Sequence, residues 1–542
     1  MRFFRLLLLT FIVVAGITLA AVAQGKLRIE ADMQNGKRDA SGRSVDNFIG
    51  NVRAFQDGTL MLCDNAITYN RIDLIATGNV RVIREGVTLY GERLIYNSET
   101  HQGVVTGKEV RLVDDSTVLV TTSIKFDSRT GSAEYNTGGT INSPDGNLVS
   151  QYGYYYKAQR KAVFKGKVVL NSDGNVIKSD SLMYLMGTST AVFIAPTDVV
   201  TPKEHMKFNR GRYNRKSGLM TASGAVYMLD ENNREVLADS IEYYKEKGLA
   251  RLFNNVQVAD SARKNYILGD YAMFNKKPES ILVTKNPVMI SISEKGDSLY
   301  LRADTLKSLI SFNAMGDTIR NMIAFRNVRS YSKDFQSSCD SMFVSGADST
   351  VSMYRQPILW SDITQITANE IKFISKNQQI SMADFIGEPF IAQRVDSSHF
   401  NQVKGKTMKA FFTDNKITRL DAVGNGQTVY FMQDKEQIMA VNITESQNLS
   451  MYFAESKIKR ITFRAKPDSR MIPLDKLAQE ETGGKLKGLN WLGNIRPNSK
   501  QDITQRVIRK AGDVVMQPGA ATPKTETKKA KTQKKLKSSE KE

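Results

Sequence analysis

The sequence predicts an all-β protein built from antiparallel strand repeats of about 29 residues, followed by a short helical segment near the C-terminus. Two recurring signals support this prediction: a six-residue pattern that ends in an aromatic residue, and a turn pair followed by Val. A third observation is a local period of two in the apolar residues, with frequent Val, Ile, Thr and Tyr. That period is typical of half-buried strands.

The first residues have the features of a secretory leader. A short basic stretch from Met1 to Arg5 precedes an uncharged apolar run from Leu6 to Ala20, and Ala21-Val22-Ala23 is a small-residue cleavage pattern. We therefore expect a signal peptide over residues 1–23. A retained anchor is the alternative, but the run is shorter than the roughly 20 apolar residues of a membrane span.

The six-residue pattern consists of a small residue, an acid or amide, any residue, an apolar residue, any residue and an aromatic residue. Clear copies occupy residues 64–69, 91–96, 179–184, 238–243, 269–274 and 368–373. Weaker copies end at Phe126, Tyr156, Tyr213, Phe411 and Tyr452, and partial copies begin at Asp304 and Asp340. Thirteen or fourteen units fit the chain, and they lengthen beyond about residue 300.

The second signal is a turn pair followed by Val, about 10 residues after the preceding aromatic residue. Gly78-Asn79-Val80, Gly166-Lys167-Val168 and Asn254-Asn255-Val256 are examples. Gly and Asn tolerate the positive φ of tight turns. Each unit is therefore predicted to be two bent strands around a reversal, and stacking of the units would bury one continuous apolar stripe.

Composition and charge exclude several classes of protein. Hydrophobic residues make up 41% of the chain, which excludes global disorder. The formal net charge is +20, but two arginines lie in the leader, and residues 518–542 hold eight lysines against three glutamates. That tail is too polar to form a core and is predicted to be disordered. The remaining bias is modest and argues little for a nucleic-acid partner.

No residue cluster indicates catalysis, a metal site or a cofactor. Cys63 and Cys339 lie nine units apart and are expected to be buried thiols without a disulfide. His101, His205 and His399 are isolated and are expected at surface or loop positions. The recurring acids, among them Asp180, Asp239 and Asp270, are expected to accept hydrogen bonds from turn amides.

The repeated motif, from Asp64-Asn65-Ala66-Ile67-Thr68-Tyr69 to Gly78-Asn79-Val80, resembles the OstA-like periplasmic proteins of lipopolysaccharide transport. The resemblance covers residues 28–465, and Leu486–Trp491 is similar to the end of longer OstA-like proteins. It implies an elongated open β-jellyroll whose apolar groove holds lipid acyl chains, with jellyrolls joined end to end between the two membranes. This chain has a longer repeat array than the short form of the family.

The resemblance assigns groove-lining, lipid-binding roles to the apolar and aromatic residues of the motif. Period-two alternation places the two members of each copy on one face. A packed core uses the same residue types, so a core and a groove wall stay open as alternatives. The candidates are Ile67, Tyr69, Leu94, Tyr96, Ile124, Phe126, Leu182, Tyr184, Tyr213, Ile241, Tyr243, Phe274 and Phe373.

These observations give a predicted organisation of the chain. A signal peptide (1–23) precedes OstA-like repeats (24–300) and further, longer repeats (301–470), then a capping or docking segment (471–517) and the Lys-rich tail (518–542). In the capping segment, short helices are expected at Leu474–Ala478 and Ile503–Ala511, and Trp491 is expected to anchor the segment to the array.

The resulting functional hypothesis is a non-catalytic periplasmic bridge that shields lipopolysaccharide acyl chains during export to the outer membrane. Its implied partners are lipopolysaccharide or a related glycolipid, membrane transport components with the same jellyroll, and further copies of the chain. Two alternatives are a structural or adhesive surface repeat protein without a lipid ligand and a secreted carbohydrate-acting enzyme. An enzyme would need carboxylates clustered at one level of the stack, and none stands out in the sequence.

Overall fold

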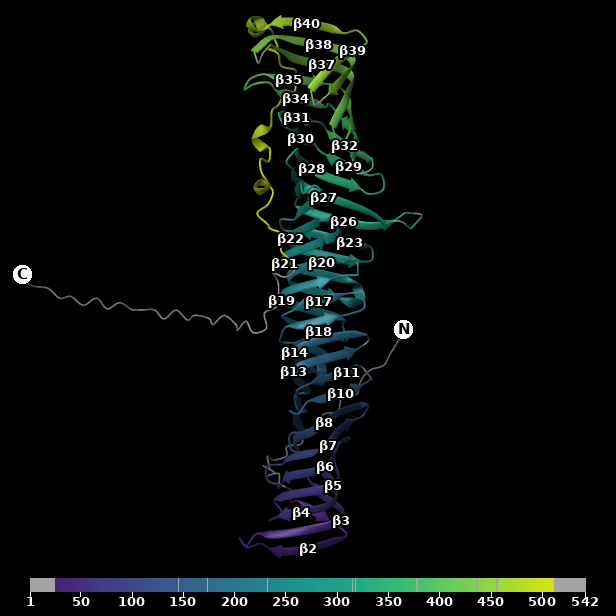
Figure 1. Cartoon of the computed structure of the whole chain (residues 1–542), viewed down its shortest axis with the longest axis vertical. Helices are drawn as coiled ribbons and strands as arrows, with labels where there is room; N and C mark the ends of the chain where they lie inside the picture. Colours follow the sequence, from purple (N-terminus) through teal and green to yellow (C-terminus); the bar gives the residue numbers. More distant parts are fainter. Residues whose placement is uncertain are drawn as a thin grey trace, which may run out of the picture. The chain divides into compact units, whose positions relative to one another are not determined.

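The computed structural model describes residues 25–510, except 145, 173, 232, 314, 317, 377–378, 415, 435–436 and 455–456. The predicted signal peptide and the Lys-rich tail lie outside the described residues. Strands dominate the described chain and their pairings are antiparallel, which confirms the all-β prediction (Figure 1). Among the described residues, no helix is long and apolar enough to cross a membrane.

The chain divides into two compact units. Unit 1 comprises Met1–His205 and Arg210–Met220, and unit 2 comprises Met206–Asn209 and Thr221–Glu542. The division falls at residues 205–221, whereas the lengthening of the sequence repeat lies near residue 300. Strands β17 (His205–Phe208) and β19 (Leu219–Leu229) lie at this division.

In unit 1, consecutive strands pair as a meander of hairpins, and β3 to β8 follow one another in Figure 1. The strands are β1 (Arg28–Glu30), β2 (Met33–Arg38), β3 (Ser44–Gln56), β4 (Thr59–Tyr69), β5 (Asp73–Arg84), β6 (Val87–Asn97), β7 (Gln102–Asp114), β8 (Thr117–Asp127), β9 (Ser132–Tyr135), β10 (Gly139–Ser143), β11 (Gly146–Ser150), β12 (Tyr152–Tyr156), β13 (Lys161–Ser172), β14 (Asn175–Leu185), β15 (Thr190–Phe193), β16 (Thr197–Val200) and β18 (Arg210–Asn214), with one 3₁₀ turn, η1 (Met186–Thr188).

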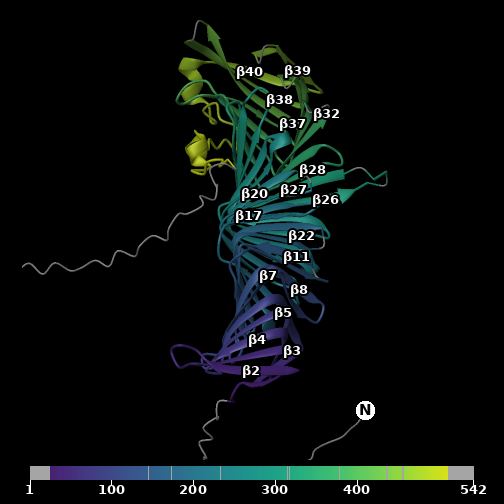
Figure 2. The ribbon, with the colours of Figure 1, turned by 60° about the horizontal axis from the view of Figure 1, so that its bottom comes forward.

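Unit 2 continues the same kind of pairing, and its hairpin β26–β27 projects beyond the neighbouring strands in both views (Figures 1 and 2). The strands are β20 (Arg234–Tyr244), β21 (Leu249–Asp260), β22 (Asn265–Lys276), β23 (Glu279–Thr284), β24 (Val288–Ile292), β25 (Ser298–Arg302), β26 (Thr305–Phe312), β27 (Thr318–Tyr331), β28 (Gln336–Ser345), β29 (Thr350–Tyr354), β30 (Ile358–Ser361), β31 (Thr364–Thr367), β32 (Glu370–Lys376), β33 (Gln379–Ile386), β34 (Phe390–Arg394), β35 (Phe400–Lys404), β36 (Thr407–Thr413), β37 (Lys416–Asp434), β38 (Gln437–Ala454), β39 (Lys457–Arg464) and β40 (Asp468–Pro473). Its 3₁₀ turns are η2 (Lys245–Lys247), η3 (Ser261–Arg263), η4 (Leu474–Gln479), η5 (Gly493–Ile495) and η6 (Lys500–Asp502).

The Gly-Asn-Val signal marks a bend inside a strand. In β5, Gly78 and Asn79 both have positive φ, and the pairing with β4 and β6 shifts at this point. The pair is therefore a β-bulge, which bends and twists a strand, and not the turn pair that the sequence analysis expected at this signal. The reversals use other residues, such as Asn70-Arg71 between β4 and β5.

The bend sends the two halves of a strand into different sheets. In β14, Leu182–Leu185 pairs with β15, while Val176–Ser179 pairs with β16. We call sheet 1 the sheet that contains β2, β9, β12, β15 and β18 in unit 1, and β23, β26, β29, β32, β33, β36 and β39 in unit 2. Sheet 2 contains β1, β10, β11 and β16 in unit 1, and β24, β25, β30, β31, β34, β35 and β40 in unit 2.

The inner faces of the two sheets meet in apolar clusters. In unit 1, Leu94 and Ile124 of sheet 1 share a cluster with Met61 and Leu89 of sheet 2. In unit 2, Ile371 and Phe385 of sheet 1 share a cluster with Leu301 and Val403 of sheet 2. Two sheets of shared, bent strands around an apolar interior are the arrangement of a β-jellyroll.

Candidate functional site

In four of the motif copies, the apolar member lies on the inner face next to the bend. Leu94, Ile124 and Leu182 in unit 1 and Ile241 in unit 2 are almost completely buried. Burial of this kind stabilises a sandwich by about 1.5–3 kcal/mol per large apolar side chain. These four candidates belong to the packed apolar interior of their own unit.

The copy at residues 64–69 is out of step with the others. Ala66 and Thr68 are buried there, whereas Ile67 is 36% exposed on the outer face and the ring of Tyr69 lies under the guanidinium of Arg43. A strand has a period of two, so a one-residue error in alignment moves a side chain to the opposite face. The prediction that Ile67 and Tyr69 face inward is therefore wrong. In this copy, Asp64 occupies the acid position of the motif and Ala66 occupies the inward apolar position.

The aromatic member of the other copies lies on the inner face towards the strand end. In unit 1, Tyr184 and Tyr213 are half-buried. In unit 2, Tyr243, Phe274 and Phe373 are half-buried in the same way, and Phe373 packs against the main cluster. Aromatic side chains that face inward yet reach solvent are accessible to an apolar ligand, unlike the aliphatic residues next to the bend.

Tyr96 and Phe126 belong to the packed interior of unit 1. The hydroxyl of Tyr96 donates to Gln56 Oε1 at 2.8 Å and lies 3.0 Å from Ser128 Oγ, and its ring stacks on Phe126. Gly103 makes room for the ring of Phe126, because a Cβ at position 103 would lie only 2.4 Å from that ring. Tyr96 thus has the satisfied hydroxyl of a core tyrosine.

The recurring acid braces the bulge of the next strand. Asp64 accepts a hydrogen bond from Asn79 Nδ2 at 2.9 Å, and Asp32 accepts one from Asn51 at 2.8 Å. In unit 2, Asp239 pairs with Asn255 and Asp304 with Asn327, each at 2.9 Å. At these pairs the acid accepts from the side-chain amide of a bulge Asn, and not from the turn or strand-end amides that the sequence analysis expected.

The titratable residues of the described chain do not converge on a reaction centre. Cys63 and Cys339 are free and buried, as predicted, and desolvation raises the pKa of each thiol to about 12. His101 lies in a turn but is buried, contrary to the expectation of a surface position. Among the described residues, no group of three or more His, Cys, Asp or Glu could hold a metal ion.

Residues 474–510 of unit 2 form an extended segment, which we call the strap, that runs back along the outer face of sheet 2 (Figure 1). The 3₁₀ turns η4, η5 and η6 and further turns at residues 481–484 and 487–488 interrupt its backbone. The helix expected at Ile503–Ala511 is wrong for the described residues 503–510, which have no helical structure; Arg509 bonds to Gln257 of β21 instead.

Buried glutamines hold the strap to the sheet. Gln402 donates to the carbonyl oxygen of Gly484 and accepts from the N–H of Leu486, at 2.9 and 2.7 Å. Gln365 pairs in the same way with Asn490 and Leu492, and Gln257 with both backbone groups of Arg509. Gln336 accepts from the side chain of Arg496. A side-chain amide that bonds both a C=O and an N–H imitates one step of a β-ladder.

An apolar seam lies beneath the strap. Leu477 and Leu486 pack with Phe431, Val441 and Ile443 of sheet 2. Further along, Ile508 packs on Leu268, Val288 and Ile290. The ring of Trp491 packs against that of Phe400 in a tilted arrangement and lies under the guanidinium of Arg394, which confirms its predicted anchoring role. Sequence periodicity could not reveal this seam, because its partners come from separate segments of the chain, 34 residues apart for Leu477 and Ile443 and 218 for Ile508 and Ile290.

The comparison with known families concerns the N-terminal part of the chain. Residues 26–180 match the model of the family described as OstA-like protein. This part of the chain is an OstA-like domain. The Asp64–Asn79 brace lies within the OstA-like domain, and the equivalent braces at Asp239 and Asp304 lie beyond the matched residues.

Among solved structures, 27 chains match. One is LptH from Pseudomonas aeruginosa, described as the LptA-homologous periplasmic component of the lipopolysaccharide transport device. It is 13% identical, with a TM-score of 0.20, and the match covers 25% of this chain and 93% of LptH. No curated protein matches this chain.

Proposed function

We propose that the chain is a periplasmic bridge protein that carries lipopolysaccharide, or a related glycolipid, with its acyl chains against the inner face of the two sheets. The observation that carries the proposal is that each unit has half-buried aromatic side chains on its inner face: Tyr184 and Tyr213 in unit 1, and Tyr243 and Phe274 in unit 2. The OstA-like domain supports the same reading.

The physical basis of the proposal is the cost of exposing acyl chains to water. Apolar surface costs about 25 cal/mol per Å² in water, so a lipid with several chains needs a continuous apolar surface to cross an aqueous compartment. Stacked repeats supply such a surface without a catalytic group. The headgroup phosphates would stay outside and pair with cationic side chains.

Depletion of the protein in living cells tests the transport role. Newly made lipopolysaccharide is expected to accumulate at the inner membrane, and complementation by the wild-type chain is expected to restore export. The double variant Tyr243→Asp, Phe274→Asp places two charges on the inner face and is expected not to complement, whereas Glu242→Gln on the outer face is expected to complement. Normal export in depleted cells would contradict the proposal.

A further inference from the structure

An arginine row crosses the outer face of sheet 2 in unit 1. Cross-strand pairing sets Arg53, Leu62, Arg81, Tyr90, Arg111 and Val120 side by side on β3 to β8. The neighbouring residues Ala54 and Val82 belong to the core, so the row faces outward. Neighbouring strands lie about 4.8 Å apart, which puts an arginine about every 10 Å along the row.

The arginines of this row are available to a ligand. All three are exposed, and neither Arg53 nor Arg81 forms an ion pair with a carboxylate of the described chain. Glu30 opposes Arg53 but pairs with Arg28 at 2.7 Å. Arg111 has only a long 3.9 Å contact with the exposed Glu109. The ring of Tyr90 lies about 6 Å from the guanidinium groups of Arg81 and Arg111.

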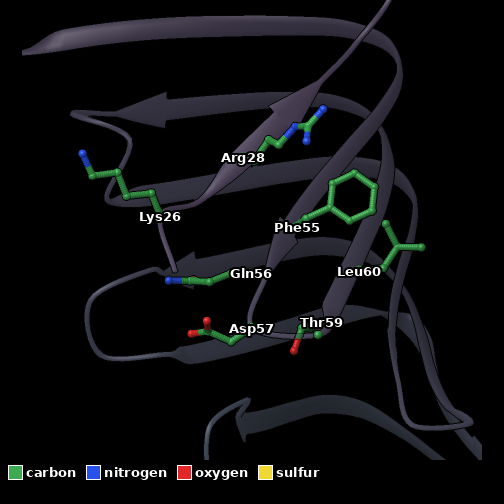
Figure 3. A pocket seen from close by; sticks show the side chains of 8 residues that line it. Lys26, Arg28, Phe55, Gln56, Asp57, Thr59 and Leu60 are labelled. Carbon is green, nitrogen blue, oxygen red and sulfur yellow. The ribbon is translucent and has the colours of Figure 1, made fainter. Parts of the chain in front are cut away.

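An apolar row runs beside the arginines on the same outer face. Phe55 pairs with Leu60, and Leu60 with Ile83. At its end lies a pocket of about 300 Å³ lined by Phe55, Leu60, Lys26 and Arg28, among others. Figure 3 shows the ring of Phe55 between the side chains of Arg28 and Leu60. The face therefore offers alternating cationic and apolar contacts.

Unit 2 shows what the corresponding face of its own sheet 2 can hold. There the strap covers an apolar seam and is fixed by polar side chains on every second strand: Gln336 on β28, Gln365 on β31 and Gln402 on β35. The strap also brings Arg506 to Asp270, at 2.5 Å. The outer face of sheet 2 in unit 2 thus binds an extended peptide that crosses the strands.

We propose that the outer face of sheet 2 in unit 1 binds an extended acidic peptide segment of a partner protein. In unit 2 the peptide supplies the arginines and the sheet supplies the acceptors. In unit 1 the sheet supplies Arg53, Arg81 and Arg111, so charge complementarity requires carboxylates in the peptide. Arginine pairs with carboxylates through two parallel hydrogen bonds, which gives the contact geometric specificity.

The spacing of the row defines the peptide. A peptide in the extended polyproline II conformation advances about 3.1 Å per residue with three residues per turn, so acids at every third position would lie on one face and meet an arginine on every second strand. The residues between them would contact Tyr90, Leu62 and the apolar row. A peptide of about twelve residues holds one acid more than the three arginines of the row require.

The test uses the purified full chain and a fluorescein-labelled peptide of about twelve residues with Glu at every third position and Val or Thr between. We expect saturable binding by fluorescence anisotropy that weakens with salt. The variant R53Q/R81Q/R111Q is expected to weaken it at least about tenfold. The control R93Q/R210Q/R212Q removes three exposed arginines from the outer face of sheet 1 in the same unit and is expected to change it less than about twofold.

Three results would overturn the proposal. One is absence of binding by the wild-type chain, and another is an equal loss in the two triple variants, which would indicate a non-specific charge effect. The third is sedimentation of the chain with vesicles of anionic phospholipid, lost in R53Q/R81Q/R111Q, without peptide binding; the face would then serve a lipid surface. A peptide with Gln in place of Glu is expected not to bind.

Discussion

Gln365 and Asn490 lie 125 residues apart in the chain and are joined by a hydrogen bond of 2.7 Å from the side-chain amide to the backbone carbonyl oxygen. The oxygen of the same amide accepts from the N–H of Leu492 and from Trp360 Nε1. One buried side chain therefore satisfies three groups of the sheet and the strap. We regard Gln365 as the central polar attachment between the strap and sheet 2.

The first prediction concerns the hydrogen bonds of Gln365. Gln365→Ala leaves buried backbone groups and the Trp360 indole N–H without partners, so it is expected to lower the free energy of unfolding by about 1–3 kcal/mol. The strap is expected to lose hydrogen-exchange protection around Leu492. Gln379→Ala, at an exposed position of β33, serves as the control and should have little effect. Unchanged protection in Gln365→Ala would mean that the apolar seam alone holds the strap.

The second prediction concerns the bulge. Gly78 has φ +77°, and a Cβ there would lie 2.3 Å from a carboxylate oxygen of Asp64. Gly78→Ala therefore adds a clash to the backbone strain of a left-handed conformation. Gly58 has φ +75° with nothing within 4 Å, so Gly58→Ala carries the strain alone.

We expect urea denaturation to give a loss of about 1–2 kcal/mol for Gly58→Ala and a larger loss for Gly78→Ala. Equal losses in the two variants would show that the side chain of Asp64 moves away from the added Cβ without lowering the free energy of unfolding.

The third prediction separates the two faces of sheet 1 in unit 1. Leu94 is completely buried, so Leu94→Ala is expected to cost about 2–5 kcal/mol. Ile67 has the same place in the sequence pattern but lies on the outer face, so Ile67→Ala is expected to cost less than about 1 kcal/mol. Thermal unfolding measures both, and a similar shift in the two variants would contradict the assigned register.

The fourth prediction concerns the thiols. Because burial raises the pKa of Cys63 and Cys339 to about 12, both stay protonated at pH 8 and should react with a thiol reagent only after unfolding. An unfolded thiol ionises near pH 9, so this contribution to stability is present below pH 9 and is lost as the pH rises towards 12. Rapid labelling of the native chain would contradict the burial.

The strand repeats could be predicted from the sequence because period-two alternation, Gly-Asn pairs and recurring acids are local signals. The alternation predicted the buried positions of Leu94, Ile124, Leu182 and Ile241. It failed at Ile67, because the copy there has Ala66 at the inward position and a small residue gives a weak hydropathy signal. The Gly-Asn pairs were visible, but a bulge and a reversal use the same residues.

The strap could not be predicted in the same way. Its extended backbone has no period of its own, and Gln365 and Gln402 look like surface residues in an apolar strand. Their burial depends on a segment that lies more than 80 residues further along the chain. The arginine row has a similar origin, because Arg53, Arg81 and Arg111 become neighbours only through the strand register. Such long-range pairing is not encoded in local spacing.

The central claim is that the inner face contacts lipid, and site-specific photo-crosslinking in living cells tests it most directly. A photoreactive phenylalanine analogue replaces Tyr243, which is half-buried and faces inward, or its neighbour Glu242, which faces outward on the same strand. We predict lipopolysaccharide adducts at position 243 and none at position 242. Adducts at position 242 but not at position 243 would contradict lipid contact by the inner face.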